Sequence, residues 1–303
     1  MKKNHTLKSF FPEDKIAFSF SAIIILIQIY YFVTGFIKEL STIIIPFISF
    51  LVLLFIINFQ YKLKSKSLKF IRSYLHIPFY GIIFTAFQSF VHKLNPNDYD
   101  LLLLNWDLSI FGFDITRWLE LYIAKWLTEV LTLSYFSYYI LPTLTFILLF
   151  FSRNNESFLR VRNYLLSIVI GWYGAFVFYL LLPAAGPDIA FPENYRIHLL
   201  GLSPITNTYL QNVSRYLKES FVRNTFPSMH FGIILITNYF AFKYKRNYFW
   251  FCTMPLGIML GMATLYLRQH YLIDLAASFP IAIASIYAAI SVNNKYYKKE
   301  NKL

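Results

Sequence analysis

The chain has 303 residues, of which 57% are hydrophobic and 20% aromatic, and its mean hydropathy is +0.49. Soluble domains contain about 45–50% apolar residues, so this composition excludes an ordinary water-soluble protein and indicates a chain that lies in a lipid bilayer. Lys and Arg exceed Asp and Glu by 28 to 15, but no basic stretch is organised as a nucleic-acid-binding module. The single cysteine, Cys252, excludes an internal disulfide and a cysteine metal cluster.

Apolar runs long enough to cross a membrane follow one another along the chain. A helix needs about 20 apolar residues to cross the hydrocarbon core. The first run is longer than the core of a signal peptide and lacks a small-residue cleavage site, so it is predicted to be a retained span. Eight runs lie near residues 16–36, 41–60, 74–92, 127–151, 163–184, 227–242, 248–267 and 271–292. The sequence therefore predicts an all-α integral membrane protein with about eight transmembrane helices.

The basic residues between these runs alternate between dense and sparse segments. Nineteen of the 28 Lys and Arg residues lie in the N-terminal segment, in every second connection and in the C-terminal tail. Because cytoplasmic segments are enriched in Lys and Arg, both termini are expected in the cytoplasm, where the basic side faces anionic lipid head groups. The Lys-rich ends and the absence of an organelle signal favour a bacterial inner membrane, with the outer face toward the periplasm.

Two connections on the outer side are long and rich in polar residues. The first, residues 95–125, combines tryptophans with five carboxylates, and its loosely helical pattern predicts one or two helices at the membrane interface. The second, residues 183–226, is rich in Pro and Gly and is predicted to contain a short helix around 207–220. Functional residues are therefore sought on the outer side.

Polar residues from three of the apolar runs meet that outer face. The seventh run ends, and the eighth begins, within a segment that contains Arg268, His270 and Asp274. The sixth run begins at the same face with Ser228 and His230. His270 and Asp274 are four residues apart and share one face of a helix. Two histidines, a carboxylate, an arginine and a serine are therefore predicted to lie at one depth.

These residue types suit phosphoryl chemistry. An imidazole held by a carboxylate is a competent nucleophile or base, and a second imidazole can protonate a leaving oxygen. An arginine binds phosphate in a planar, bidentate fashion, and a serine hydroxyl with helix-opening amides can hold further phosphate oxygens. Ionisable groups near the hydrocarbon boundary are costly, which makes each of them a functional candidate.

Structural roles explain the same residues one at a time. Asp274 can cap a helix, Ser228 is a common N-cap residue, and Arg268 can extend its side chain to the interface. A zinc site is not predicted, because it needs three converging ligands and Asp274 is better explained as a carboxylate that orients His270.

The sequence FPSMH at 226–230, followed some forty residues later by HYLID at 270–274, resembles the second and third signature motifs of the type 2 phosphatidic acid phosphatase superfamily of membrane enzymes. YLRQHYLIDLAAS, PAAGP and DLLLLNWDLSIFG resemble most the branch that contains fungal inositol phosphorylceramide synthases and their bacterial relatives. The resemblance implies a six-helix phosphatase or phosphotransferase domain over residues 74–292. A pair of extra helices (1–73) precedes this domain, and a basic tail (293–303) follows it.

The resemblance also implies roles for individual residues. His270 resembles the nucleophile that forms a phosphohistidine, Asp274 the carboxylate that orients it, and His230 the acid that protonates the leaving group. Ser228 resembles the phosphate-binding serine. The scheme needs no metal and no cofactor, and the partner is a phospholipid or lipid-phosphate substrate in the bilayer. Water as acceptor makes the enzyme a phosphatase, whereas a lipid or polyol hydroxyl makes it a transferase.

The chain lacks the cations that the phosphatase motifs would place in the site. The two cations of the first motif correspond to Tyr179 and Gly186 in this chain. The arginine of the third motif corresponds to Thr264. The phosphate charge is therefore expected to be met by Arg268 together with a cation of the second outer connection. Arg223 is the candidate taken for the site, and Arg196, Arg215 and Lys218 are the alternatives.

A transporter or lipid-binding protein without enzymatic activity, with the histidines as proton-coupled gates, is the alternative. Transporters place charged groups near the bilayer midplane, whereas the polar groups here gather at one face. A nucleic-acid partner is not expected. The oligomeric state, the lipid and the acceptor stay open.

Overall fold

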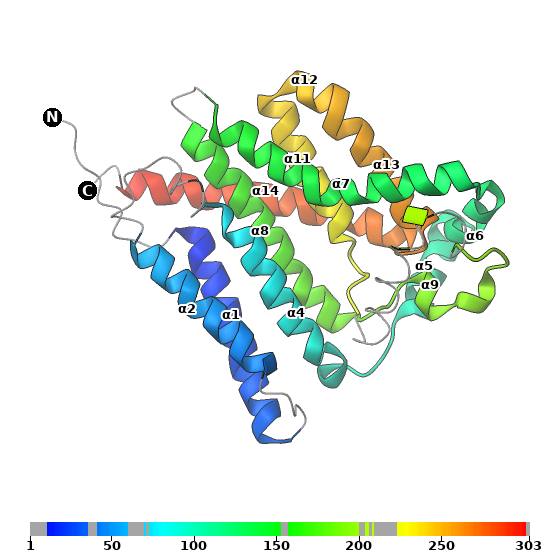
Figure 1. Ribbon diagram of the computed structural model, residues 1–303, viewed down its shortest axis with the longest axis horizontal. Coiled ribbons are helices and arrows are strands. Elements are labelled where there is room, and N and C mark those ends of the chain that lie inside the picture. Colours follow the sequence, from blue (N-terminus) through cyan, green and yellow to red (C-terminus); the bar gives the residue numbers. More distant parts are fainter. Residues whose placement is uncertain are drawn as a thin grey trace. The chain divides into compact units, whose positions relative to one another are not determined.

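A computed structural model describes residues 11–35, 41–59, 70, 73–152, 157–199, 204, 205, 208 and 223–300. Within these ranges every regular element is a helix (Figure 1). The α-helices are α1 (Pro12–Val33), α2 (Ser41–Phe59), α4 (His76–Leu94), α5 (Asp100–Phe111), α6 (Ile115–Leu119), α7 (Lys125–Phe150), α8 (Ser157–Leu181), α9 (Pro187–Ala190), α11 (Met229–Tyr244), α12 (Arg246–Tyr248), α13 (Met254–Tyr266) and α14 (Leu272–Glu300). Shorter turns are η2 (Glu120–Tyr122), η3 (Pro192–Asn194) and the π-helical η4 (Phe249–Thr253).

The prediction of an all-α membrane protein is confirmed. Five helical segments of the described chain are long and apolar enough to cross a bilayer: Pro12–Val33, Lys125–Phe150, Ser157–Leu181, Arg246–Tyr266 and Leu272–Tyr296. Each of the eight predicted apolar runs corresponds to a helical segment, but the number of eight spans stays a prediction. The short helix predicted around 207–220 falls, except for residue 208, outside the described residues.

Two compact units make up the chain, one formed by Met1–Phe90 with Ile290–Leu303 and the other by Val91–Ala289. In the first unit α1 packs against α2, and the buried Asp14 joins the start of α1 to α4. Its carboxylate accepts a hydrogen bond from the backbone N–H of Phe11 (2.7 Å) and lies 2.9 Å from Nε2 of His76. The domain boundaries expected from the sequence stay a prediction.

The second unit holds the packed helices α7, α8, α11 and α13. Two glycines on α13, Gly257 and Gly261, allow α11 to approach closely. A Cβ atom at Gly257 would lie 2.8 Å from Cγ2 of Ile234, and one at Gly261 would lie 2.9 Å from Cε2 of Phe231. Small residues four apart let membrane helices pack closely. This contact sets the position of α11, at whose start the predicted site residues lie.

Short helices fill the connection between α4 and α7. Gly112 ends α5 in a left-handed conformation with φ of 84°, which glycine adopts without steric cost. Asp114 then opens α6, because its carboxylate accepts hydrogen bonds from the backbone N–H groups of Thr116 (2.9 Å) and Arg117 (3.1 Å). In Figure 1, α5, α6 and α9 gather at the end of α13.

Candidate active site

The turn between α13 and α14 carries the predicted nucleophile. The backbone N–H of Arg268 bonds to the carbonyl of Leu265 (3.0 Å), and that of Gln269 bonds to the carbonyl of Thr264 (2.9 Å). This is the Schellman pattern of a helix end, in which glycine normally takes the left-handed position. Here Arg268 takes it, with φ of 57°, at a cost of about 1–3 kcal/mol. The turn places His270 two residues before α14 begins.

His270 is buried and held through one ring nitrogen. Its Nδ1 lies 3.0 Å from the carbonyl oxygen of Thr225 and 3.2 Å from Oδ2 of Asp274. Both partners are acceptors when the carboxylate is ionised, so Nδ1 carries the proton and Nε2 keeps its lone pair. Asp274 is fully buried, and its Oδ2 also accepts the backbone N–H of Tyr271 (2.8 Å). The carboxylate therefore fixes both the ring and the turn.

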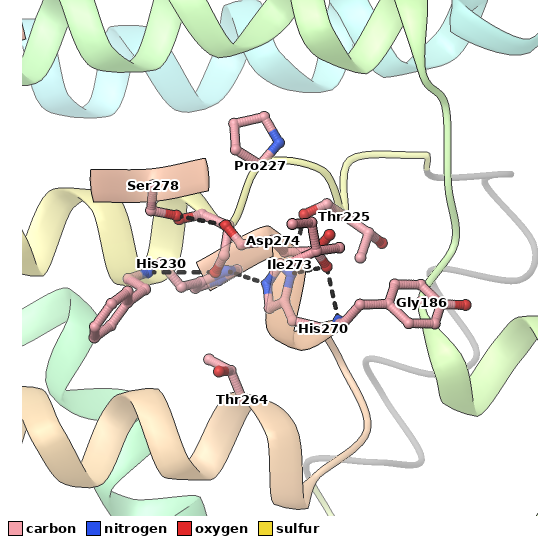
Figure 2. Close-up of polar contacts among 12 residues, drawn as sticks. Gly186, Thr225, Pro227, His230, Thr264, His270, Ile273, Asp274 and Ser278 are labelled. Atoms are coloured by element: carbon pink, nitrogen blue, oxygen red, sulfur yellow. Dashed lines mark hydrogen bonds and ion pairs between the residues drawn. The ribbon is translucent and has the colours of Figure 1, made fainter. Parts of the chain in front are cut away.

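The second predicted histidine faces the first. His230 lies in the first turn of α11, and its Nδ1 is 3.5 Å from Nε2 of His270. Figure 2 traces this contact and those to Asp274 and Thr225 as dashed lines. The other nitrogen of His230, Nε2, lies 3.0 Å from the hydroxyl of Tyr135 on α7. Residues from α7, α11 and the α13–α14 turn thus form one chain of polar contacts.

Ser228 serves as the N-cap of α11. Its hydroxyl accepts the backbone N–H of Phe231 (3.4 Å), and its own N–H bonds to the carbonyl of Asp274 (3.1 Å). Ser278, one turn after Asp274 in α14, shares its hydroxyl hydrogen between the carbonyl of Ser228 (2.7 Å) and that of Asp274 (2.8 Å). The starts of α11 and α14 are therefore tied together, which sets the distance between the two histidines.

Asp100 on α5 supports the turn from the side. Its carboxylate accepts the backbone N–H groups of Ala185 (2.9 Å) and Gly186 (2.8 Å) and the hydroxyl of Tyr271 (2.9 Å). Burial raises the pKa of this carboxyl, and the hydrogen bonds from Ala185, Gly186 and Tyr271 oppose the rise. A buried carboxylate with three donors is a strong fixed contact. Asp100 thereby joins the PAAGP segment to the residue after His270.

Asp107 lies seven residues further along α5, which is close to two helical turns, and faces the same side. Its two oxygens accept the backbone N–H groups of Leu272 (2.8 Å) and Ile273 (2.7 Å), the first two residues of α14. Burial raises the pKa of the Asp107 carboxyl, and these two hydrogen bonds oppose the rise. Sequence reasoning did not assign Asp100 or Asp107 to the site. Their seven-residue spacing within an apolar helix is the signal that was available.

Gly186 packs directly against the α13–α14 turn that carries His270. It has φ of 93°, and a Cβ atom at this position would lie 2.6 Å from the carbonyl oxygen of Gln269. A side chain here would displace the backbone next to His270. The resemblance described above expects a first-motif arginine at this position, and the local geometry of this chain leaves no room for a side chain there.

Arg268 and Arg223 each pair with a carboxylate. The guanidinium of Arg268 is buried, donates to the carbonyl of Ile197 (2.9 Å), lies 3.3 Å from Oε1 of Glu120 and stacks 3.8 Å above the Tyr195 ring. Arg223 forms a bidentate pair with Asp98. The phosphate-binding roles predicted for the two arginines stay predictions.

The other two positions that depart from the phosphatase pattern are also buried in the structure. The hydroxyl of Tyr179 donates to the carbonyl of Pro227 (3.4 Å), and that of Thr264 donates to the carbonyl of Gly261 (2.7 Å). Both side chains therefore stabilise backbone segments of the site. Within the ranges that the structure describes, no group of three His, Cys, Asp or Glu side chains is placed to hold a metal ion.

Electrostatics favour a neutral His270. Burial lowers its pKa well below the ordinary 6.5, the neighbouring His230 lowers it further, and the hydrogen bond to Thr225 raises it. A neutral imidazole with its proton on Nδ1 presents the Nε2 lone pair, which is the requirement for a nucleophile. The pair of imidazoles is therefore arranged to attack an electrophile at one nitrogen and to move a proton at another.

Comparisons with known proteins found a matching family and a relative. The family model described as PAP2 superfamily matches residues 102–288, which include most of α5 with Asp107, both histidines and Asp274. A PA-phosphatase related-family protein of Dictyostelium discoideum is 25% identical over 181 residues. That alignment covers 54% of this chain and 32% of the relative, so the chain spans about a third of the relative's length. No solved structure gave a significant match.

Proposed function

The chain belongs to the PAP2 superfamily, and from this premise we propose that it is a membrane-embedded phosphatase or phosphotransferase that cleaves a lipid phosphoester through a phosphohistidine at His270. The observation that carries the proposal is the orientation of His270. Its Nδ1 is occupied by Thr225 and Asp274, while its Nε2 faces His230 at 3.5 Å.

The first step forms the phosphoenzyme. Nε2 of His270 attacks phosphorus with its lone pair, and the P–O bond to the lipid alcohol breaks. The leaving oxygen takes a proton from the imidazolium of His230, which becomes a neutral imidazole. Phosphorylated His270 keeps its Nδ1 proton, and the Asp274 carboxylate balances the positive charge on the ring.

The second step releases the phosphoryl group. An acceptor hydroxyl attacks phosphorus, the P–N bond breaks, and Nε2 of His270 recovers its electron pair. Neutral His230 takes the proton of the attacking hydroxyl and is restored as an imidazolium. Water as acceptor gives a phosphatase. A lipid or polyol hydroxyl gives a transferase, and the resemblance to inositol phosphorylceramide synthases supports transfer of an inositol-phosphate-like head group.

Ser228, Arg268 and Arg223 are the proposed phosphate-binding residues. Ser228 lies at the start of α11, two residues before His230, where a helix N-terminus favours an anion. In the structure Arg268 pairs with Glu120 and Arg223 pairs with Asp98. To bind a phosphate, each arginine exchanges its carboxylate partner for the substrate.

The proposed setting follows from the Lys and Arg distribution. Both termini lie in the cytoplasm, and the site faces the outer side of a bacterial inner membrane. The six-helix domain comprises residues 74–292, preceded by two helices within 1–73 and followed by the tail 293–303. No metal or cofactor takes part in this scheme.

The experiment is a product analysis of purified protein reconstituted in lipid nanodiscs. Phosphatidate, a lipid diphosphate and phosphatidylinositol are supplied in turn, with and without a lipid alcohol as acceptor. We expect turnover of at least one substrate and a loss of at least about 10³-fold in His270→Ala, because a missing nucleophile removes the covalent route. Phosphate as the sole product indicates a phosphatase, and a new phospholipid in the presence of the alcohol indicates a transferase.

His198→Ala is the matched control, because His198 is an exposed histidine of the second outer connection. It is expected to retain wild-type turnover. Full turnover in a correctly inserted His270→Ala protein would contradict the proposal, as would a pH-driven solute flux, without phosphate release, that persists in His270→Gln.

A further inference from the structure

The neighbours of His230 on α7 have no role in the scheme above. The ring centroid of Tyr135 lies 4.9 Å from that of His230, and the centroid of Tyr138 lies 4.6 Å from it. The two tyrosines are three residues apart and therefore share a face of α7. Only their rings are equivalent, because their hydroxyl groups have different partners.

The hydroxyl of Tyr135 lies 3.0 Å from Nε2 of His230. The hydroxyl of Tyr138 instead accepts the indole N–H of Trp172 (3.2 Å). Tyr135 is buried in an apolar cluster with Leu131, Leu199, Ala263, Tyr266 and Leu267, at the end of α13 that leads to His270. Its ring is therefore fixed by packing, and its hydroxyl is held at the far nitrogen of His230.

We propose that Tyr135 is a positioning residue that keeps Nε2 of His230 occupied, so that Nδ1 is the nitrogen that exchanges protons with the substrate. This inference rests on the proposed function. It follows from the order of contacts Tyr135–His230–His270, in which each imidazole is held at one nitrogen and faces the other imidazole with its second nitrogen.

The protons along this chain of contacts are interdependent. Because Nδ1 of His270 donates to acceptors, its Nε2 is unprotonated, and the facing Nδ1 of His230 must donate for the 3.5 Å contact to be attractive. In neutral His230 the Nε2 atom then has no proton and accepts the Tyr135 hydroxyl hydrogen. Without substrate, neutral His230 thus carries its proton on Nδ1, the nitrogen that faces His270.

The same hydroxyl serves both protonation states of His230. When His230 is an imidazolium, Nε2–H donates to the Tyr135 oxygen and Nδ1–H is available to the leaving oxygen. After that transfer His230 is neutral with its proton on Nε2, still bonded to Tyr135, and its Nδ1 lone pair takes the proton of the attacking hydroxyl. A phenol can donate or accept, whereas a carboxylate can only accept. No proton is left on Tyr135 or removed from it over the cycle.

The test compares leaving groups in Tyr135→Phe. A lipid alkoxide is a strong base and needs a proton as it leaves, whereas p-nitrophenolate leaves without one. The substrates are phosphatidate and p-nitrophenyl phosphate, or phosphatidylinositol and the p-nitrophenyl ester of inositol phosphate if the enzyme acts on diesters. We expect kcat/KM, which reports phosphoenzyme formation with loss of the leaving group, to fall about 10- to 100-fold on the lipid and less than about 3-fold on the aryl ester, since general-acid catalysis contributes about 10²–10⁴-fold.

Tyr139→Phe is the matched control, because it removes the same atom from the same helix at a side chain that is 61% exposed. It is expected to leave both rates unchanged. Equal losses on the two substrates, or no loss on the lipid, would overturn the inference. His270→Ala separates the two proposals: it must abolish turnover of both esters if the proposed function holds, and retained turnover there refutes the function itself.

Discussion

The two histidines of the site are held by different kinds of surroundings. His270 lies on a turn fixed by a carboxylate, a backbone carbonyl and, through residues 271–273, the two aspartates of α5. His230 lies among aromatic rings, and the hydroxyl of Tyr135 is 3.0 Å from its outer nitrogen. The difference matches the proposed chemistry. A nucleophile that becomes positively charged benefits from an anion, whereas a group that gains and loses a proton needs a partner able to donate and accept.

The surroundings of the two histidines also differ in rigidity. The turn at His270 has a dense set of backbone hydrogen bonds between 2.7 and 3.2 Å, which lock its conformation. The start of α11 is also tied to α14 through Ser228, but the surroundings of the His230 ring come mainly from the packing of α11 against α7 and α13. Substitutions around His270 should therefore affect folding and catalysis together, and those around His230 should affect proton transfer more selectively.

The largest expected effect concerns Asp274. In Asp274→Asn the negative charge opposite the phosphorylated ring is lost. The amide oxygen must then accept the hydrogen bonds from both His270 and the backbone N–H of Tyr271. We expect kcat to fall about 10³–10⁴-fold, the scale of loss when a carboxylate that orients a catalytic histidine becomes an amide. The exposed Glu193→Gln is the control. A loss below about tenfold would mean that His270 does not depend on this carboxylate.

A smaller effect is expected for Asp107, which contacts the turn only through backbone N–H groups. Asparagine has one acceptor oxygen, so Asp107→Asn leaves either Leu272 or Ile273 without a partner. Hydrogen bonds to charged groups contribute about 1.5–3 kcal/mol, so the thermal midpoint should fall by several degrees and kcat by about tenfold, with KM little changed.

Asn105→Ala, at an exposed position of the same helix, provides the comparison for Asp107. Unchanged thermal stability and kcat in Asp107→Asn would show that α5 does not hold the turn. A rise in KM with constant kcat would instead place Asp107 in substrate binding.

The smallest effect is the pH dependence. In the proposed scheme the neutral form of His270 is the nucleophile, and burial with the nearby His230 lowers the pKa of His270 below 6.5. The acid limb of kcat/KM, which reports the free enzyme, should therefore lie below pH 6.5. A pH series on the lipid substrate checks this, and an acid limb above pH 6.5 would contradict a buried, neutral nucleophile.

Much of the site was predictable because its chemistry is local in the chain. The spacing of His270 and Asp274 already places them on one helical face, and the apolar run after Ser228 predicts a helix that this serine caps. The all-helical membrane fold follows from apolar runs that have no other way to satisfy their backbone polar groups in lipid.

The remaining contacts could not be predicted, because they join residues far apart in sequence. Asp100 and Asp107 meet the turn across more than 160 residues, and Tyr135 meets His230 across 95. The sequence predicts a phosphate-binding role for Arg268 but gives no sign that its guanidinium is buried between Glu120 and Tyr195. Local periodicity has no information about such partners.

The sequence by itself therefore determined the membrane class, the helical segments and the residue types of the two motifs, since each depends on hydropathy or on spacing within one helix. Only the tertiary structure decided which nitrogen of each histidine is held, which carboxylates support the turn and which arginines already have partners. The physical reason is that hydrogen bonds are directional and short. Their partners are chosen by the packing of α5, α7, α11 and α14, and not by the order of residues along the chain.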